Sequence, residues 1–368
     1  MLPAFTPAGA RRGSQPRSRE GDVPGVVPAR PSLGALLGTL ALASILGGCT
    51  GAPTLPGGTN TAASPTTGPA AGTSIPSSPT GIPISAPKYL PNIAYATASS
   101  SEVLDLSIPT SGSGPYPLVI LIHGRAFKVG DKIDDGPNAD ADASLAKGYA
   151  TASLNYRLSG EAIFPAAVQD VKAAVRFLRA NAVKYGLDPI RFAVWGRSAG
   201  GNLAALIGTI GDQATIFDDP ALGNAGTKSA VQAVIDWYGP SDFRVLDKQM
   251  TANTPAGGIG QTEPHDPADS PESIYLGGAI QKVPAAAKAA GPISYLATAK
   301  KLPVFSLAAG DSDCLIPHEQ SEILNTALKA AGATSTFTLV AGAYHNDLLI
   351  ATSQTPVALA LLADIFGR

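Results

Sequence analysis

The chain has 368 residues, of which 45% are hydrophobic, with 26 Lys and Arg against 28 Asp and Glu. A chain of this length and composition can bury a large core. Its near-neutral charge, without a basic run in the body of the chain, argues against a nucleic-acid partner.

The N-terminal region predicts export. Five arginines, at positions 11, 12, 17, 19 and 30, precede an apolar stretch, Ser32 to Leu46, which is too short for a comfortable permanent membrane span. The stretch ends in Leu46-Gly47-Gly48-Cys49, which resembles the lipobox of bacterial lipoproteins. Residues 1–48 are therefore predicted to be a lipoprotein signal peptide, with Cys49 lipidated and the protein anchored at the cell membrane surface. The alternative is an ordinary secretory signal. A lipidated Cys49 cannot form a disulfide, which would leave Cys314 as a lone thiol.

Residues 49–87 are predicted to be a flexible tether. The segment is rich in Gly, Pro, Ser and Thr and has no charged residue. Such a composition has too few large apolar side chains to offset the entropy of ordering. Residues 88–368 are then predicted to form the globular domain.

From Lys88 onward strand and helix patterns alternate, which predicts an α/β fold with a mostly parallel sheet flanked by helices. The Gly/Pro-rich segment from Pro240 to Pro292 is expected to form a small cap over the carboxyl edge of the sheet. The predicted strands are 102–108 (as an edge strand), 117–122, 149–155, 191–195, 231–237, 304–308 and 336–340, and the predicted helices are 164–185, 199–210, 318–331 and 347–366.

A candidate nucleophile lies between a predicted strand and a predicted helix. The sequence there is Gly196-Arg197-Ser198-Ala199-Gly200-Gly201. A sharp strand-to-helix turn needs glycines, and it exposes the serine hydroxyl above the sheet. Ser198 is the predicted nucleophile, and the alternative is a tight turn with a buried serine.

The base follows from elimination among four histidines. His123 precedes the serine, whereas this type of site has its histidine last in the chain. His265 lies in the irregular segment and is interpreted as a surface loop residue, and His318 is expected to face solvent at a helix start. His345 follows the last predicted strand, so it is the predicted base.

Two further elements complete the predicted site. The acid is expected after a late strand, where Asp313 is chosen and Asp311 is the alternative. The run His123-Gly124-Arg125-Ala126-Phe127 leaves a buried strand and predicts an oxyanion loop, whose amides would act with that of Ala199. The alternative is a simple turn at the strand end.

Five aspartates in residues 131–142 do not have the spacing of a calcium loop. They are interpreted as a solvated loop with helix-capping residues: Asp131, Asp134, Asp135, Asp140 and Asp142. No zinc pattern occurs, so no metal and no cofactor is predicted.

Several stretches taken together resemble a known family, the bacterial esterases and lipases of the α/β-hydrolase fold near hormone-sensitive lipase, often labelled BD-FAE-type carboxylesterases or acetyl esterases. In chain order these stretches are HGRAFKVGDK, SLNYRLS, FPAAVQDVKAAVRFLRANA, YGLDPIRFAVWGRSAGGNLAAL, WYGPSDF, SPESIYLGG, GDSDCLIPHEQSE and GAYHNDL. The resemblance implies a Ser198, Asp313 and His345 triad, with oxyanion amides from Gly124, Arg125 and Ala199. It also implies hydrolysis of short acyl esters, including acetyl or hydroxycinnamoyl (feruloyl) groups on plant polysaccharide.

Two residues depart from the family pattern. The family usually has glycine at the position of Arg125 and an acidic residue at that of Arg197. An arginine at 125 is strained if the loop needs a positive φ there. We expect Arg125 to reach the mouth of the site and favour anionic substrates, and Arg197 to pair with a carboxylate beneath the turn. The rival functions are a serine exopeptidase, an acyltransferase and a non-catalytic surface binding protein, and the sequence does not indicate an oligomeric state.

Overall fold

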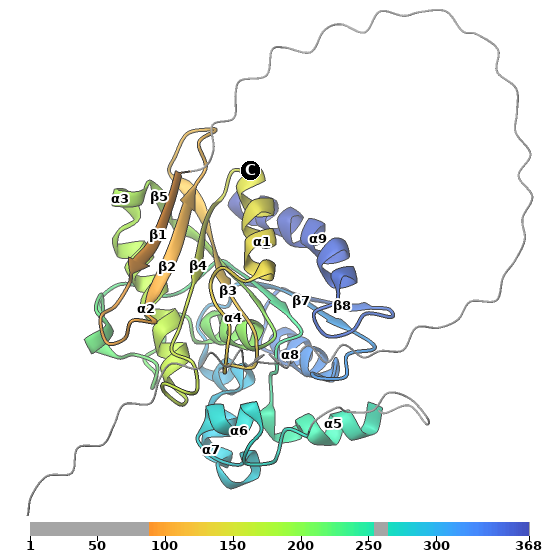
Figure 1. Cartoon of the computed structure of the whole chain (residues 1–368). Coiled ribbons are helices and arrows are strands. Elements are labelled where there is room, and N and C mark those ends of the chain that lie inside the picture. Colours follow the sequence, from red (N-terminus) through yellow and green to blue (C-terminus); the bar gives the residue numbers. More distant parts are fainter. Residues whose placement is uncertain (1–87, 254–263, 368) are drawn as a thin grey trace, which may run out of the picture. The chain divides into compact units, whose positions relative to one another are not determined.

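An eight-stranded sheet runs through the computed structural model, which describes residues 88–253 and 264–367 (Figure 1). The strand order is β1-β2-β4-β3-β5-β6-β7-β8. β1 and β2 are antiparallel to their neighbours, and all pairs from β4 to β8 are parallel. The strands are β1 Lys88–Ala94, β2 Val103–Ile108, β3 Tyr116–Ile122, β4 Ala150–Leu154, β5 Leu187–Arg197, β6 Ala233–Trp237, β7 Val304–Gly310 and β8 Ser335–Val340.

The centre of the sheet is buried on both faces. Every residue of β3, β4 and β6 is buried, as the continuous apolar runs in these segments predict. The prediction of an edge strand at 102–108 is wrong, because β1 pairs outside β2 and takes the edge. β1 has no buried residue and contains Pro91, and its register shifts between Leu90 and Ile93. Because of these features, the sequence of β1 lacks the alternation of apolar and polar residues that predicts a strand.

Helices cover both faces of the sheet. α1 and α9 pack on one face, and α2, α4 and α8 pack on the other (Figure 1). α9 is long and apolar enough to span a membrane by composition, but its inner face packs into the core through Ile350, Leu362 and Phe366. The helices are α1 Asp135–Ala146, α2 Ala166–Ala180, α3 Ala182–Tyr185, α4 Ala199–Ile210, α5 Leu246–Asn253, α6 Pro271–Leu276, α7 Pro284–Ala289, α8 Glu319–Ala330 and α9 Leu348–Phe366.

The described part of the segment from Pro240 to Pro292 forms α5, α6 and α7, which lie together beyond one end of the sheet (Figure 1). One buried side chain holds both ends of this segment. The Asn202 amide on α4 donates to the carbonyl of Pro240 at 2.8 Å and to that of Ala290 at 3.0 Å. The small cap is therefore anchored on the helix that follows the nucleophile turn.

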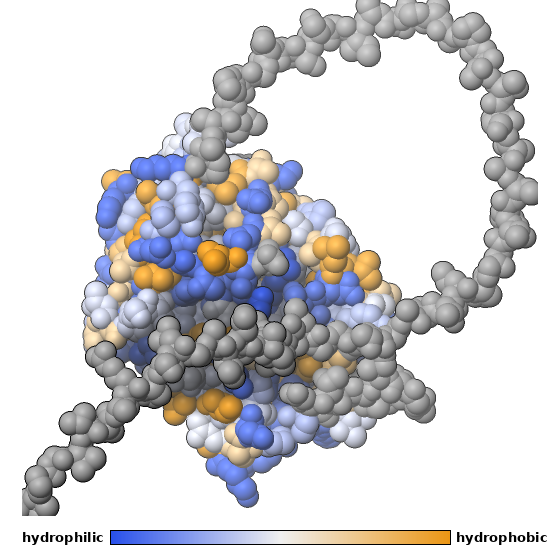
Figure 2. Space-filling view, in the orientation of Figure 1, coloured by the Kyte–Doolittle hydropathy of each residue, from blue (hydrophilic) through white to orange (hydrophobic). Residues whose placement is uncertain are grey.

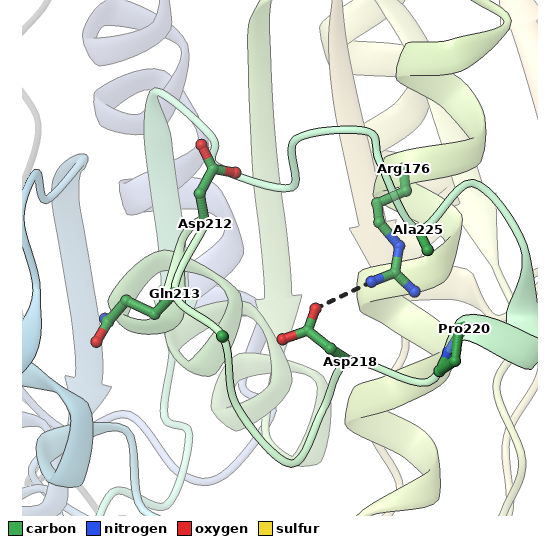
Figure 3. A pocket seen from close by; sticks show the side chains of 7 residues that line it. Arg176, Asp212, Gln213, Asp218, Pro220 and Ala225 are labelled. Atoms are coloured by element: carbon green, nitrogen blue, oxygen red, sulfur yellow. Dashed lines mark hydrogen bonds and ion pairs between the residues drawn. The ribbon is translucent and has the colours of Figure 1, made fainter.

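A polar hollow of about 260 Å³ lies beside α2 and the C-terminal end of α4 (Figure 3). Lys172 and Arg176 lie one turn apart on α2 and are almost fully buried, and both bind Asp218, at 2.7 Å and 3.1 Å. A 12-residue helix is about 18 Å long. The length of α4 therefore separates this hollow from Ser198, which precedes the other end of the helix.

Apolar and hydrophilic residues are mixed on the visible surface of the domain (Figure 2). On the face shown in Figure 2, the visible apolar groups form small patches between hydrophilic residues. This pattern is typical of a domain surface in contact with water.

Cys314 is disulfide-bonded in the structure. The prediction that Cys314 is a lone thiol, which depended on lipidation of the other cysteine, is therefore wrong. The other cysteine of the sequence is Cys49, which lies outside the described residues together with the predicted signal peptide and tether. A thioether-linked lipid uses the sulfur that a disulfide needs, so one molecule cannot have both at Cys49.

A buried carboxylate lies beneath the nucleophile turn. Asp236 on β6 accepts a hydrogen bond from the Gly239 amide at 3.0 Å, and a Cβ at Gly201 would lie 2.2 Å from the same oxygen. Its other oxygen makes no hydrogen bond within the described part of the chain. Burial raises the pKa of Asp236 to about 7, although the bond from Gly239 acts in the opposite direction.

We expect Asp236→Asn to remove a pH-dependent part of the stability. The folded state keeps the Asp236 proton up to about pH 7, whereas the unfolded chain loses it near 3.8. This contribution is fully present below the unfolded pKa and is lost as the pH rises through the folded pKa. Urea unfolding should show the variant gaining roughly 3 kcal/mol relative to the wild type between pH 5 and pH 8. Parallel pH dependences of the two proteins would contradict the assignment.

Candidate active site

Ser198 occupies a strained turn between β5 and α4. Its φ of 53° lies in the left-handed region, which costs a non-glycine residue free energy. Two glycines make the turn possible, because a Cβ at Gly196 would lie 1.9 Å from the Gly200 carbonyl oxygen, and one at Gly200 would lie 2.2 Å from that of Ile122. The predicted strand, turn and helix are therefore present, and the serine lies at the carboxyl end of the sheet.

The three predicted catalytic side chains meet at this edge. The Nε2 atom of His345 lies 3.0 Å from the Ser198 hydroxyl oxygen, and its Nδ1 atom lies 2.8 Å from Oδ2 of Asp313. The other oxygen of Asp313 accepts hydrogen bonds from the amides of Leu315 and Ile316, both at 2.9 Å. The Asp313 carboxylate has no solvent-exposed surface. The arrangement forms a continuous hydrogen-bonded path from a carboxylate to a hydroxyl.

Asp311, the alternative acid, lies elsewhere in the same loop. Its Oδ1 atom accepts from the Gly342 amide at 2.7 Å and from the Ser312 hydroxyl at 2.9 Å. The bond from Gly342 joins the loop after β7 to the loop after β8. The structure therefore places Asp313, and not Asp311, against His345.

The other histidines have different surroundings. His123 is buried and stacks on Tyr156, with ring centroids 4.4 Å apart, and burial lowers its pKa. His318 precedes α8 and lies 3.2 Å from Glu322. The prediction of a surface position for His265 is wrong, because only 6% of this residue is exposed. Its burial comes from contacts with residues that are distant in sequence, which local composition does not reveal.

The loop after β3 has an unusual backbone. Arg125, Ala126 and Phe127 have φ values of 69°, 56° and 59°, so three successive non-glycine residues are left-handed. Such a conformation costs about 1 kcal/mol or more per residue. Within the described residues, the amides of Arg125 and Ala126 donate no hydrogen bond to the protein, and a Cβ at Gly124 would lie 2.7 Å from the Arg197 carbonyl oxygen. Unpaired amides thus lie beside the nucleophile turn.

Aromatic packing holds this strained loop. Phe127 is buried and stacks on Tyr275 of α6, with ring centroids 3.8 Å apart and planes 6° from parallel. The Phe127 carbonyl accepts from the Ser159 amide at 2.8 Å. The Tyr156 hydroxyl donates to the His123 carbonyl at 3.0 Å. Tyr156 and Ser159 lie in the loop after β4, which therefore supports the loop after β3.

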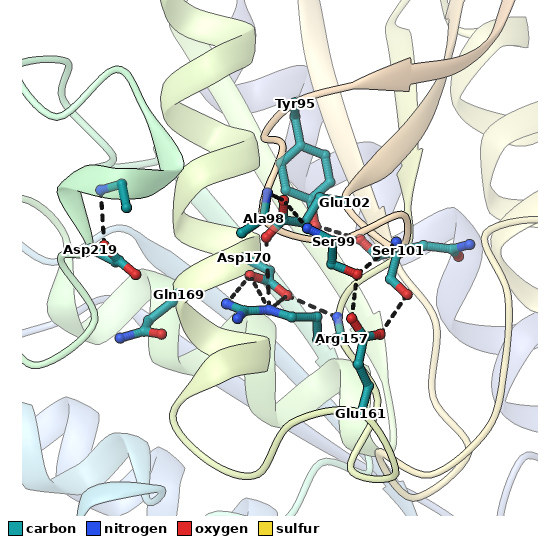
Figure 4. A network of polar contacts seen from close by, with 12 residues as sticks. Tyr95, Ala98, Ser99, Ser101, Glu102, Arg157, Glu161, Gln169, Asp170 and Asp219 are labelled. Atoms are coloured by element: carbon teal, nitrogen blue, oxygen red, sulfur yellow. Dashed lines mark hydrogen bonds and ion pairs between the residues drawn. The ribbon is translucent and has the colours of Figure 1, made fainter.

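The loop after β4 is itself held by an ionic network (Figure 4). The Arg157 guanidinium binds Asp170 of α2 at distances from 2.6 to 3.1 Å and lies 3.8 Å from Glu102. Burial raises the pKa of Asp170 against the opposing effect of Arg157. Glu102 in turn accepts from the amides of Ala98 and Ser99, at 2.7 and 3.0 Å. The network connects the loop after β4, which supports the predicted oxyanion loop, to α2 and to the turn between β1 and β2.

Comparison with known proteins places the chain in a family. The sequence model of the BD-FAE family matches residues 104–328, which is more than half of the chain. The chain belongs to the BD-FAE family. It is 30% identical to Esterase LipQ of Mycobacterium tuberculosis over 282 residues, which cover 75% of this chain and 61% of LipQ. It is 38% identical to Carboxylesterase NlhH of Mycobacterium tuberculosis over 194 residues, covering 43% of this chain and 59% of NlhH.

Solved structures agree with this membership. A truncated form of a carbohydrate esterase from gut microbiota has a TM-score of 0.66 and 29% identity, covering 76% of this chain and 97% of that one. The BD-FAE chain described here therefore has the α/β-hydrolase fold. The match spans about six tenths of the length of the curated relatives.

Arg125 and Arg197 both have acidic partners. Arg125 has a positive φ, and its Nε atom lies 2.9 Å from Asp134. Arg197 forms a two-point ion pair with Asp140 at 2.7 and 2.9 Å, and its guanidinium lies over the Trp237 ring at 4.6 Å. The predicted pairing of Arg197 with a carboxylate is confirmed. The expectation that Arg125 makes the site favour anionic substrates stays a prediction.

Asp140 was interpreted as a solvated residue, and this is wrong because it is buried against Arg197. Burial raises its pKa to about 6, although the charge of Arg197 opposes the shift.

A second feature that the sequence did not reveal is Tyr238, which follows β6. Its ring packs edge-on against the imidazole of His345 at 4.8 Å, and its hydroxyl donates to Asn346 at 3.0 Å. The Arg197 and Tyr238 side chains therefore fill the space around the nucleophile turn and the imidazole.

We expect Asp140→Leu alone to be far more harmful than the double variant Asp140→Leu/Arg197→Met. The single change leaves a buried guanidinium without its carboxylate, which costs about 3 kcal/mol or more of folding free energy. Replacing both charges by apolar side chains should recover most of this loss. Denaturant unfolding of the two variants tests the pair. A double variant no more stable than the single one would show that the ion pair is not the relevant interaction.

Proposed function

We propose that this protein is a serine hydrolase of carboxylic esters, with Ser198 as nucleophile, His345 as base and Asp313 as acid. The observation that carries the proposal is the pair of contacts at His345, 3.0 Å to the hydroxyl and 2.8 Å to the carboxylate. A serine hydroxyl is a weak nucleophile unless a base is held beside it, and a base needs a third group to orient it. The three side chains supply these roles.

The proposed reaction has two halves. His345 accepts the proton of Ser198 as the serine oxygen attacks the ester carbonyl, and Asp313 stabilises the resulting imidazolium. The alcohol then leaves with the proton from His345, which gives an acyl-enzyme. Water repeats the sequence, so that the acid leaves and the serine regains its proton.

The negative oxygen that forms in both halves needs hydrogen-bond donors. We assign this role to the amides of Gly124, Arg125 and Ala199. Ala199 is the first residue of α4, so its amide is among the unpaired N–H groups at a helix start. Each such donor can lower the barrier by about 3 kcal/mol. Because these donors belong to the backbone, an arginine at position 125 is compatible with the chemistry.

We propose short acyl esters on carbohydrate, acetyl or feruloyl, as the substrate class. Relatives of known structure include the gut carbohydrate esterase and a bifunctional GH43-CE protein of Bacteroides eggerthii, which is 30% identical over 75% of this chain. Release of acetate or ferulate from substituted xylo-oligosaccharides, compared with release from p-nitrophenyl esters of increasing acyl length, tests this class. A preference for long acyl chains over acetylated or feruloylated sugars would refute it.

We expect Asp313→Asn and Asp311→Asn to differ by several orders of magnitude in kcat. Loss of the Asp313 charge leaves the imidazole in the wrong tautomer and should lower kcat on the order of 10⁴-fold. Asp311 does not contact His345, so the Asp311→Asn variant keeps the bond between Asp313 and His345 and should stay within a few-fold of the wild type. Hydrolysis of p-nitrophenyl acetate measures both, with Ser198→Ala as the inactive reference. Equal losses in the two aspartate variants would contradict the assignment.

We also propose that Cys49 carries a lipid that anchors the exported protein to the cell membrane. The support is the lipobox-like sequence Leu46-Gly47-Gly48-Cys49 followed by an uncharged tether. Since Cys314 is disulfide-bonded in the structure, the alternative state is a disulfide between the two cysteines of the chain.

Expression in a bacterial host distinguishes the two states. We expect Cys49→Ala to move the protein from the membrane fraction to the soluble fraction, whereas Cys314→Ala stays in the membrane fraction. Mass spectrometry should find an N-terminal Cys49 bearing acyl chains. Recovery of an unlipidated Cys49 bonded to Cys314, or membrane retention of Cys49→Ala, would refute the anchor.

A further inference from the structure

Both ring nitrogens of His265 face hydrogen-bond acceptors. Nδ1 lies 3.1 Å from Oε2 of Glu272 on α6, and Nε2 lies 2.9 Å from the carbonyl oxygen of Leu315. A carboxylate and a carbonyl can only accept. A neutral imidazole has a single N–H, so both contacts are hydrogen bonds only when the ring carries two protons. The geometry therefore favours a buried imidazolium.

The charges around His265 agree with this state. Burial by itself would lower the pKa of the ring, but the hydrogen bond and charge of Glu272 and the charge of Asp247 outweigh it and raise the pKa above its ordinary value. Asp247 of α5 also accepts from the amides of His265 and Asp266, at 2.7 and 3.0 Å. Three separate parts of the chain thus converge on one residue: α5, α6 and the loop after β7.

The peptide group between Leu315 and Ile316 belongs to the support of Asp313. Its carbonyl, that of Leu315, accepts from His265, while its N–H, that of Ile316, donates to Oδ1 of Asp313 at 2.9 Å. The opposite oxygen of Asp313 faces His345. A shift of this peptide group would therefore move the Ile316 amide, one of the two amides that orient the carboxylate of Asp313, and with it the partner of His345.

The helix that bears Glu272 also contacts the oxyanion loop. Tyr275 of α6 stacks on Phe127, and the Tyr275 carbonyl accepts from the Phe164 amide at 2.7 Å. A single six-residue helix therefore contacts the loop after β3 through an aromatic ring, and the loop after β7 through the Glu272 and His265 pair.

We propose that His265 is a positioning residue for the reaction: as an imidazolium it joins Glu272 to the Leu315 carbonyl and so holds Asp313 in line with His345. This inference rests on the proposed function. His345 must be neutral to accept the serine proton, whereas His265 must be charged to keep both bonds. Activity should therefore fall at alkaline pH as His265 loses its proton.

The variant Glu272→Gln tests this arrangement with little change of shape. Removing the negative charge beside His265 should shift the alkaline limb of the kcat profile to lower pH by about one unit. KM should change less than twofold, because in this proposal both residues act through Asp313. The matched control is Glu322→Gln, which neutralises the partner of His318 at 3.2 Å, away from the Asp313 carboxylate. The control should leave the alkaline limb in place.

NMR of the ¹⁵N-labelled mature protein gives a readout that does not depend on turnover. The chain has only four histidines, so each ring is assigned by single substitutions. We expect both nitrogens of His265 to be protonated at pH 7 in the wild type and in Ser198→Ala, with a titration that coincides with the alkaline limb. His265→Gln should lower kcat at least tenfold at the pH optimum.

Two results would overturn the inference: a single ring proton on His265 at pH 7, or an alkaline limb unchanged in Glu272→Gln. The NMR measurement uses the wild type and Ser198→Ala. It therefore tests the protonation of His265 even if the His265 or Glu272 variants do not fold. Failure of the proposed function gives a different result: the wild type would then hydrolyse no ester, or Ser198→Ala would be as active as the wild type, whatever the state of His265.

Discussion

The close backbone contact between the ends of β3 and β5 is the constraint on which the site depends. These strands are parallel neighbours, with Ile122 opposite Gly196, so the chain leaves both strands side by side. The turn at Ser198 then brings Gly200 against the Ile122 carbonyl, at a separation that admits no side chain. A larger residue at either glycine would separate the nucleophile from the loop whose amides lie beside it. The register of two buried strands thus determines which chemical groups meet.

The loop after β3 shows how the surrounding structure sustains strain. Three left-handed residues in succession would not persist in an isolated peptide, since each disfavours the conformation by about 1 kcal/mol or more. The opposing contributions come from buried contacts: Phe127 on Tyr275, and the Tyr156 hydroxyl on the His123 carbonyl. Strain of this kind is typical of sites that must be preorganised. The aromatic residues that hold the loop are therefore as much part of the site as the amides that it presents.

The sequence was most informative where chain order and sheet topology constrain chemistry. Parallel strands end at one edge, so residues that follow successive strands meet there, and this reasoning predicted that Ser198, Asp313 and His345 lie together, as they do in the structure. The same reasoning did not predict burial that arises from contacts between distant segments. His265 contacts Leu315, 50 residues away, and Asp140 contacts Arg197, 57 residues away. A charged or polar residue in a Gly/Pro-rich or acidic segment gives no local sign of such a partner. The edge strand β1 was missed for a related reason, because its side chains are mostly exposed and carry no alternation.

A crystal structure of the protein after reaction with a short-chain alkyl phosphonate ester tests the central claim most directly. The phosphorus atom imitates the tetrahedral carbon of the ester reaction, and its free oxygen imitates the negatively charged one. The account predicts phosphorus bonded to the Ser198 oxygen, with the free oxygen within about 3 Å of the Ala199 amide and of an amide in the loop after β3. Phosphorus bonded to another residue, or a free oxygen directed into solvent away from these amides, would contradict it.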